Sequence, residues 1–264
     1  MATTYWLKFG NTALGYNGKA LKTEYAPLQP KSVRFKFATG YTPTPTQDTS
    51  FHRWEWVQVS SSPNVWDLTI PTARNWAILR NDNSSLNRVM RAATEVLTGD
   101  FTGATLAFEH ERDGWKGFFM GLPITKVGPL HNVGGEPIRL FCDCFSLVSV
   151  ASISGSATNA FEMFGYCTSL KTPPALSSGW LSFSNMFRGC TSLEVVPLYY
   201  TSTVTNVTNM FLDCTGVKSG ALALYNQMAN QATPPARHNY CFYNCGSRTT
   251  TGAAELAQIP SDWK

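Results

Sequence analysis

An eight-residue phrase that occurs twice in the chain constrains its fold more than any other feature. The stretches MFGYCTSL (163–170) and MFRGCTSL (186–193) are nearly identical and lie twenty-three residues apart. All seven cysteines fall between residues 142 and 245, and five of them follow a phenylalanine at a spacing of three. Successive phenylalanines of this Phe-x-x-Cys unit are 23, 23, 24 and 31 residues apart. A fixed period in this range is typical of a solenoid of stacked repeats.

The repeat has a third fixed position, because four of the five units carry an aliphatic residue three places after the cysteine. A single turn of a solenoid cannot bury its apolar face alone, so the same residues should fill the same slice of core in every turn. The predicted core residues are Phe141, Cys144, Leu147, Phe164, Cys167, Leu170, Phe187, Cys190, Leu193, Phe211, Cys214, Val217, Phe242 and Cys245. Arg248 takes the aliphatic position of the last unit.

One degenerate turn is expected before these five. Twenty-three residues before Phe141 the sequence has Phe118, with Ile124 in the aliphatic position and Gly121 in place of cysteine. Within a unit, SNMFRGC (184–190) favours a short helical turn, and TSLEVVPLYY (191–200) a strand that ends at a proline. One turn would then consist of a helical segment, a cysteine corner, a short strand and a loop.

The cysteines allow three interpretations. A disulfide framework would leave at least one of the seven unpaired. Equivalent residues on successive turns lie about 5 Å apart with parallel Cβ directions, farther than the roughly 3.8 Å between Cβ atoms that a disulfide prefers. Metal binding by Cys142 with Cys144, or by Cys241 with Cys245, lacks a second pair at zinc-site spacing. We therefore expect a column of buried free thiols, with no metal and no cofactor.

The string NMFxxCTSL followed by proline, with the Thr- and Asn-rich loop TSTVTNVTNMF (201–211), resembles the BspA-like leucine-rich repeats found in bacterial surface lipoproteins. The resemblance covers about residues 138 to 250. It implies a leucine-rich-repeat-type solenoid used for binding, often to host or bacterial surfaces.

The last forty-five residues resemble the C-terminal cap of such repeats in fibre and structural proteins of tailed bacteriophages of gut bacteria. In SGALALYNQMANQA (219–232) apolar residues recur at helical spacing, and AAELAQIP (253–260) predicts a second short helix that Pro260 ends. Helices here would shield the open end of the solenoid. The resemblance implies a virion component, although members of the family differ widely in role.

The N-terminal half has a different character. It holds six of the eight tryptophans, and the alternating runs 32–38, 53–59 and 64–70 predict half-buried strands. SLNRVMRAATEVL (85–97) predicts an amphipathic helix capped by serine, and the turn-rich stretch 39–50 an exposed loop. Trp54 and Trp56 share one strand face. They form either an aromatic pair of the core or a contact surface for a sugar ring or another subunit.

Charge and hydropathy argue against two classes of partner. Lys and Arg outnumber Asp and Glu by fifteen to eleven before residue 142 and are balanced at six each afterwards, without a run of like charge. Nucleic-acid binding usually needs a basic stripe, so no nucleic-acid partner is expected. No apolar run reaches the length of a membrane span, and the N-terminal residues do not read as a signal peptide. We expect no membrane insertion.

Enzyme signatures are sparse. The common motifs for a serine nucleophile, a phosphate-binding loop or a zinc protease do not occur. The densest acidic cluster is Glu109, Glu111 and Asp113, and two carboxylates on one strand would only just reach the separation that a glycosidase needs. We interpret it as a solvated strand end. His238 lies three residues before Cys241, but inside the repeat frame, where packing is the simpler explanation.

The sequence thus predicts a mixed α/β chain: a β-rich attachment or oligomerisation domain (1–115), a BspA-like leucine-rich-repeat solenoid (116–250) and a helical cap (251–264). We expect a non-enzymatic binding or structural protein of a bacteriophage virion, such as a fibre, decoration or receptor-binding protein. Its partners would be other virion proteins, a bacterial surface glycan or protein, and further copies of itself. The alternatives are a bacterial cell-surface adhesin, with an extracellular location, and a carbohydrate-active enzyme.

Overall fold

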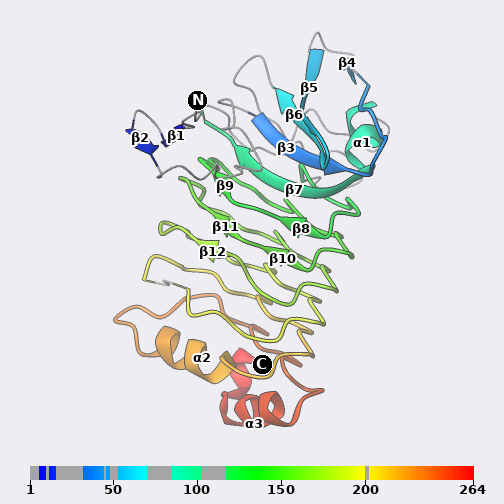
Figure 1. Ribbon diagram of the computed structural model, residues 1–264. Helices are drawn as coiled ribbons and strands as arrows, with labels where there is room; N and C mark the ends of the chain where they lie inside the picture. The colour runs from blue at the N-terminus through cyan, green and yellow to red at the C-terminus, as the bar shows by residue number, and fades with distance from the viewer. Residues whose placement is uncertain are drawn as a thin grey trace.

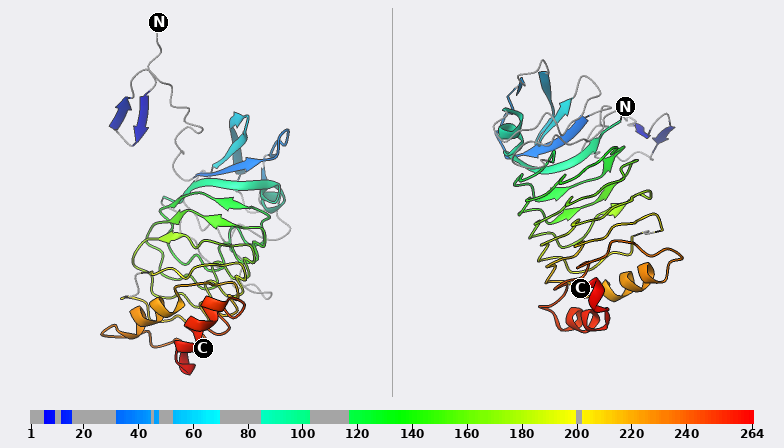
Figure 2. Two further views of the ribbon diagram at one scale, coloured as in Figure 1. Left: turned by 60° about the horizontal axis from the view of Figure 1, so that its bottom comes forward. Right: turned by 180° about the vertical axis from the view of Figure 1, so that it is seen from behind.

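The computed structural model describes residues 6–9, 12–15, 32–44, 46–47, 53–69, 85–102, 117–199 and 202–264. Strands of the N-terminal half form a sheet at one end, a series of stacked turns follows, and two helices and the C-terminus lie at the other end (Figure 1). The two further views show the same order from below and from behind (Figure 2). The fold is mixed α/β and mainly β.

The N-terminal strands comprise a hairpin and the antiparallel part of a larger mixed sheet. Their bounds are β1 (Trp6–Phe9), β2 (Thr12–Gly15), β3 (Ser32–Phe37), β4 (Thr46–Gln47), β5 (Arg53–Ser61), β6 (Asn64–Thr69) and β7 (Ala93–Asp100). β3 is central, with β6 and β7 antiparallel on its two sides, and β5 continues the sheet beyond β6. The three predicted strands are confirmed as β3, β5 and β6.

The side chains of β3 alternate between its two faces, and both faces are buried. Val33, Phe35 and Phe37 enter the hydrophobic core. On the opposite face Arg34 makes a bidentate ion pair with Asp67 of β6, with both N–O distances 2.7 Å and both residues almost fully buried. A buried charge needs such a partner, because the interior does not replace its hydration.

The helix predicted over 85–97 is wrong in its second half. The helix α1 covers Ser85–Met90, and Ala93–Asp100 forms strand β7 instead. In β7 the side chains of Ala93 and Val96 are buried against the core while the backbone hydrogen-bonds to β3. Pairing with β3 on one side and with the first turns on the other outweighs the helical spacing, because tertiary context overrides local propensity.

β7 is also the first strand of the stack. Its two halves pair with two different short strands of the first turn. Glu95 and Val96 pair in parallel with β8 (Lys126–Val127), and Gly99 and Asp100 pair in parallel with β9 (Leu130–His131). β8 continues to β10 (Ser149–Val150), and β9 continues to β11 (Ser152–Ile153) and β12 (Ala175–Leu176). β7 is therefore the first rung of two parallel columns of short strands.

The described residues share one continuous hydrophobic cluster that runs from Val33 in β3 to Trp263 near the C-terminus. Core packing thus crosses the region between the strand β7 and the first turns. The division of the chain into the domains 1–115, 116–250 and 251–264 stays a prediction.

A column of phenylalanine rings runs through the stacked turns. The rings of Phe119, Phe141, Phe164, Phe187, Phe211 and Phe242 lie parallel to within 5° to 12°, with neighbouring centroids 5.0 to 5.9 Å apart. The N–H of each of the first five phenylalanines donates to the carbonyl of the residue before the next phenylalanine, for instance Phe141 to Met163 at 2.8 Å. The repeated Phe and Cys positions are all buried.

The degenerate first turn is confirmed, but its phenylalanine is Phe119 and not Phe118. Leu122 takes the cysteine position three residues later, and Ile124 is buried in the aliphatic position as predicted. Ile124 follows Phe119 by five residues, whereas in later turns the aliphatic position follows the phenylalanine by six. The first turn is therefore one residue shorter, and counting twenty-three residues back from Phe141 reaches Phe118 in place of Phe119. Phe118 instead packs edge-on against Phe119, with centroids 4.8 Å apart.

The predicted helical segment within each turn is wrong. In each of the last five turns the residues two before and two after the stacked phenylalanine have a left-handed backbone, as at Asn185 (φ 56°) and Gly189 (φ 72°) around Phe187. Two left-handed residues four apart bend the chain sharply and exclude a right-handed helix. Ser182 accepts a hydrogen bond from the N–H of Ser184 in a local turn, which is the alternative that such residues offer to a helix.

Of the strand predicted over 191–200, the described residues 191–199 contain one bridge residue, Val195, which pairs with Ser219. Pro197 follows two residues later and has no N–H to extend the pairing.

The two predicted C-terminal helices are confirmed. They are α2 (Ala221–Ala229) and α3 (Thr250–Gln258), followed by the short 3-10 helix η1 (Ser261–Trp263). α2 occupies the extra residues of the 31-residue spacing, where Leu224 and Met228 are buried. Glu255 of α3 accepts hydrogen bonds from the backbone N–H groups of Gly220 and Leu222 at the start of α2. The carbonyl of Trp263 accepts from the N–H of Phe242 and so ends the hydrogen-bond series of the turns.

Candidate functional site

The fourteen repeat residues singled out from the sequence form the interior of the stack, where each is at most 1% exposed. Their contacts are with equivalent residues of adjacent turns. They position the surface and do not themselves reach a ligand.

The seven cysteines are all buried as free thiols. Those of Cys144, Cys167, Cys190 and Cys214 lie 3.0 to 3.1 Å from the carbonyl oxygen of the phenylalanine one turn earlier, to which each thiol donates. Burial raises the pKa of the Cys190 thiol above its ordinary value of 9.0. The same cause raises the pKa of the thiols of Cys142, Cys167, Cys214, Cys241 and Cys245. A protonated thiol is a poor nucleophile and a poor metal ligand, so these groups act in packing.

Trp56 packs partly into the core of the N-terminal sheet. Its ring lies 5.5 Å from that of Phe35 and 5.6 Å from that of Phe37, and its buried indole N–H has no hydrogen-bond partner among the described residues. Trp54 pairs with Thr46 through its backbone, and its side chain lies outside the described part of the structure. The assignment of these two residues as contacts stays a prediction.

The acidic cluster Glu109, Glu111 and Asp113 also lies outside the described residues. His238 is described, and it belongs to the cap: its ring stacks on Trp263 with centroids 4.2 Å apart, and its Nε2 lies 3.4 Å from Asp262.

The left-handed turns form a surface whose residues lie outside the core positions predicted from the repeat. Three positions per turn belong to these left-handed turns: two before, one after and two after the stacked phenylalanine. Ten of the fifteen residues there are half-buried or exposed, whereas Cys142, Glu162, Gly165, Asn185 and Gly189 are buried. We call this surface the Phe-turn face. Its residues, turn by turn, are Arg139, Cys142 and Asp143; Glu162, Gly165 and Tyr166; Asn185, Arg188 and Gly189; Asn209, Leu212 and Asp213; and Tyr240, Tyr243 and Asn244.

Polar side chains on the Phe-turn face bind one another across neighbouring turns. Arg139 forms an ion pair with Glu162. The Asn209 amide donates to Asn185 Oδ1 at 3.1 Å. The Asn244 amide donates to Asp213 Oδ1 at 2.9 Å. These bonds hold side chains in rows along the stack and so reduce the ordering cost of binding.

Two groups of aromatic side chains lie on the same face. The ring of Tyr166 covers Gly189, where an added Cβ would come within 2.7 Å of Tyr166 Cδ1, and the guanidinium of Arg188 lies 5.5 Å from the ring centre. Tyr240 and Tyr243 form an edge-to-face pair with centroids 5.9 Å apart and ring planes at 85°. Their residues are 54% and 49% exposed, so this pair offers aromatic area to a ligand.

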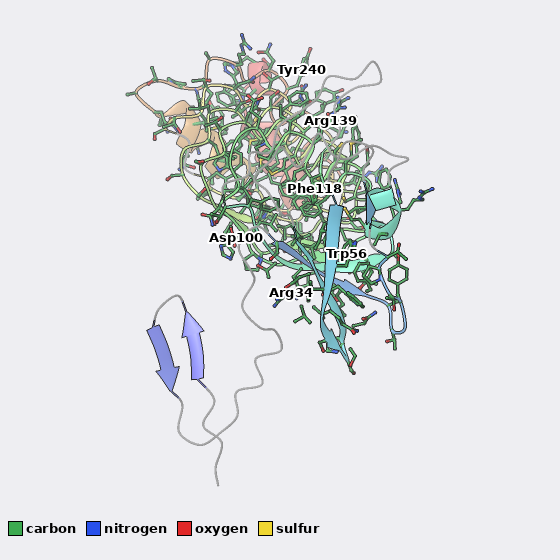
Figure 3. The ribbon with its side chains drawn as sticks, turned by 90° about the horizontal axis from the view of Figure 1, so that it is seen from above. Arg34, Trp56, Asp100, Phe118, Arg139 and Tyr240 are labelled. Atoms are coloured by element: carbon green, nitrogen blue, oxygen red, sulfur yellow. The ribbon has the colours of Figure 1, made fainter. Side chains whose placement is uncertain are left out.

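The N-terminal sheet lies at the end of the stack opposite the cap (Figure 1). Viewed along the stack, Tyr240 and Arg139 lie on the side away from Trp56 and Arg34 (Figure 3). The Phe-turn face and the N-terminal sheet are therefore separate surfaces.

The described ranges contain no group of three or more His, Cys, Asp and Glu residues placed to hold a metal ion. None of the helices in those ranges combines the length and the hydrophobicity that a bilayer crossing requires.

The tyrosines of the Phe-turn face were missed at the sequence level, although the frame that locates them was already known. Tyr240 and Tyr243 lie two before and one after Phe242, positions at which earlier turns have other residue types. The sequence signal that could have located them is the appearance of two tyrosines in the last turn, at positions outside the repeated Phe and Cys core.

No protein-family model matches the chain, and no curated protein or solved structure shows a significant match.

Proposed function

We propose that this chain is a non-enzymatic binding module: a leucine-rich-repeat-type solenoid, attached through its N-terminal β-rich part, that presents the Phe-turn face to a partner. The resemblance of NMFxxCTSL to BspA-like repeats supports the repeat type, and the buried Phe and Cys columns support the packing that such repeats need.

One observation carries the proposal: the stacked position repeats in every turn, while the positions beside it, most of them half-buried or exposed, change from turn to turn. The stacked position is phenylalanine in all six turns, whereas the position two residues before it is Arg139, Glu162, Asn185, Asn209 and Tyr240 in the last five. Packing explains the constancy of the first position but not the variety of the second. A fixed interior with a varied extended surface is how solenoid proteins bind partners.

The proposed setting is a bacteriophage virion, where the N-terminal part contacts other virion proteins or further copies of the chain and the stack contacts a bacterial surface. The phage-like C-terminal segment supports this setting. A bacterial cell-surface adhesin would use the same face in the same way. A closed homo-oligomer, seen as a mass that is a small multiple of 29.1 kDa by light scattering, favours the virion.

The test is binding of the fluorescently labelled full chain to a panel of intact gut bacteria, read by flow cytometry. We expect saturable binding to at least one strain, and competition by unlabelled chain. Absence of binding to every strain, or release of soluble sugar from the cells by the chain alone, would overturn the proposal.

A further inference from the structure

We infer that Tyr240, Tyr243, Asp213 and Asn244 form a subsite for a sugar ring of a surface glycan. This inference rests on the proposed binding function and names its ligand class. The two tyrosines would stack on the C–H faces of the sugar, and the carboxylate and amide would bind its hydroxyl groups.

The aromatic part of the subsite is exposed and held in place. Tyr240 and Tyr243 pack edge to face, so the flat face of one ring stands beside the edge of the other. The backbone N–H of Tyr243 also donates to the carbonyl of Tyr240 at 3.2 Å. Tyrosine offers large contact area with few rotatable bonds, and a fixed pair loses little further freedom on binding.

The fold does not require tyrosine at position 240. Its backbone is left-handed, with φ 56°, a conformation that costs a residue with a Cβ about 1–2 kcal/mol. Asn185 and Asn209 fill the same position in the two preceding turns, and asparagine tolerates this conformation better. A bulky, exposed aromatic at a strained position that asparagine satisfies elsewhere points to a role outside folding.

The polar part of the subsite lies directly beside the tyrosines. Asn244 follows Tyr243, and its amide donates to Asp213 Oδ1. The backbone of Asp213 is joined to the same place, because its N–H donates to the carbonyl of Tyr243 at 3.0 Å. A carboxylate and an amide oxygen each accept more than one hydrogen bond, so both have acceptor capacity beyond this contact.

This combination fits a glycan better than a protein. The centre of a protein interface is depleted of charged residues, whereas here a carboxylate adjoins the aromatic pair. A sugar presents apolar C–H groups on its ring faces and hydroxyl donors around its rim, which match the rings and the acceptors respectively. The turns also repeat every 5.4 Å at Phe164, Phe187 and Phe211, close to the length of one pyranose unit, so a linear glycan along the stack would meet one turn per sugar.

The test uses the full chain on an immobilised array of linear hexose and N-acetylhexosamine oligosaccharides. The variants are Tyr240→Ser, Tyr243→Ser and both together, with Tyr240→Phe as the conservative change that keeps the ring. The matched control is Leu198→Ser, which removes an equally exposed side chain (61%) outside this face. Thermal unfolding of each variant shows that it is folded.

We expect the parent chain to bind at least one oligosaccharide. Each single serine variant should weaken that binding by about tenfold or more, as for a central aromatic contact, while Tyr240→Phe and Leu198→Ser bind as the parent does. Equal binding by the double serine variant and the parent would overturn the inference and leave the proposed function standing. Binding to intact bacteria without binding to any glycan would do the same and indicate a protein receptor. Failure to bind either cells or glycans would overturn both the inference and the proposed function.

Discussion

The stack of turns and the N-terminal sheet both contribute fully buried apolar side chains to one core, but the residues that pack together are related differently in the two regions. In the stack, Phe187 touches residues one repeat away on either side, Phe164 and Phe211. In the sheet, Arg34 binds Asp67, and Lys36 binds Glu95 fifty-nine residues away. The contacts of the stack join residues that are one sequence repeat apart, so the repeat predicts them. The contacts of the sheet depend on strand pairing, which no sequence period predicts.

The two regions also bury polar groups differently. The sheet buries a charged pair, which is stable only while both partners are present. The stack also buries one carboxylate, Glu162, paired with the half-buried Arg139, but most of its buried polar groups along the phenylalanine column are thiols, which are neutral, bond weakly to phenylalanine carbonyls and repeat from turn to turn. This difference makes the two regions respond to different perturbations.

The largest expected effect is loss of the stack at alkaline pH. Burial raises the pKa of six thiols in the folded chain, so the unfolded chain releases these protons first as the pH rises through 9. The stability is complete below pH 9 and is lost as the pH rises above it, by about 1.4 kcal/mol per thiol for each pH unit. Together these losses exceed the stability of an ordinary domain, about 5–15 kcal/mol, within one or two pH units.

Urea unfolding at intervals from pH 7 to pH 10, with thiol alkylation to report exposure, measures this loss. A Cys142→Ala/Cys241→Ala double variant should show a shallower decline above pH 9, because two of the titrating thiols are gone. A parent chain that is equally stable at pH 8 and pH 10 would contradict the buried thiols.

Removal of one ring from the phenylalanine column should rank next. Phe187→Ala deletes a ring that is stacked on both faces, and the cavity should lower the free energy of unfolding by about 3–5 kcal/mol. Phe145→Ala is the control, since Phe145 is 57% exposed and should cost within about 0.5 kcal/mol. Chemical denaturation compares the two, and similar losses would mean that the column does not hold the stack together.

In the sheet, a comparable loss should follow from breaking the buried ion pair. Asp67→Ala leaves the Arg34 guanidinium buried without its carboxylate and should cost about 3–5 kcal/mol. The double variant Arg34→Met/Asp67→Leu removes both charges and should recover most of that loss, measured by the same denaturation. A double variant no more stable than Asp67→Ala would show that the region depends on Arg34 in another way.

The smallest effect separates folding from binding on the Phe-turn face. Tyr240→Asn places the residue of the two preceding turns in the same left-handed position and should raise the free energy of unfolding by up to about 1 kcal/mol. Thermal unfolding measures the change. A clear loss of stability would show that the exposed Tyr240 ring supports the fold, and would weaken its assignment to a ligand.

Sequence reasoning succeeded where local pattern and tertiary contact coincide. The spacing of Phe164 and Phe187 located the turns, and Leu224 and Met228 located the face of α2. It failed at residues 93–97, where a helical spacing lost to pairing with β3, and at Phe118, where the first turn is one residue shorter. At residues 93–97 the deciding contact is with a strand far away in the sequence. At Phe118 the cause is a local deletion of one residue, which a fixed count of twenty-three does not detect.

By itself the sequence determined the period of the stack, the residues of its core and the helices of its cap, because each of these follows from which side chains must leave water together. The tertiary structure alone decided the left-handed turns on both sides of the last five stacked phenylalanines, the use of β7 as the first rung, and the meeting of Tyr240, Tyr243, Asp213 and Asn244 on one face. These depend on hydrogen bonds between turns, such as Asp213 to Tyr243, which join residues thirty apart and which no single repeat contains.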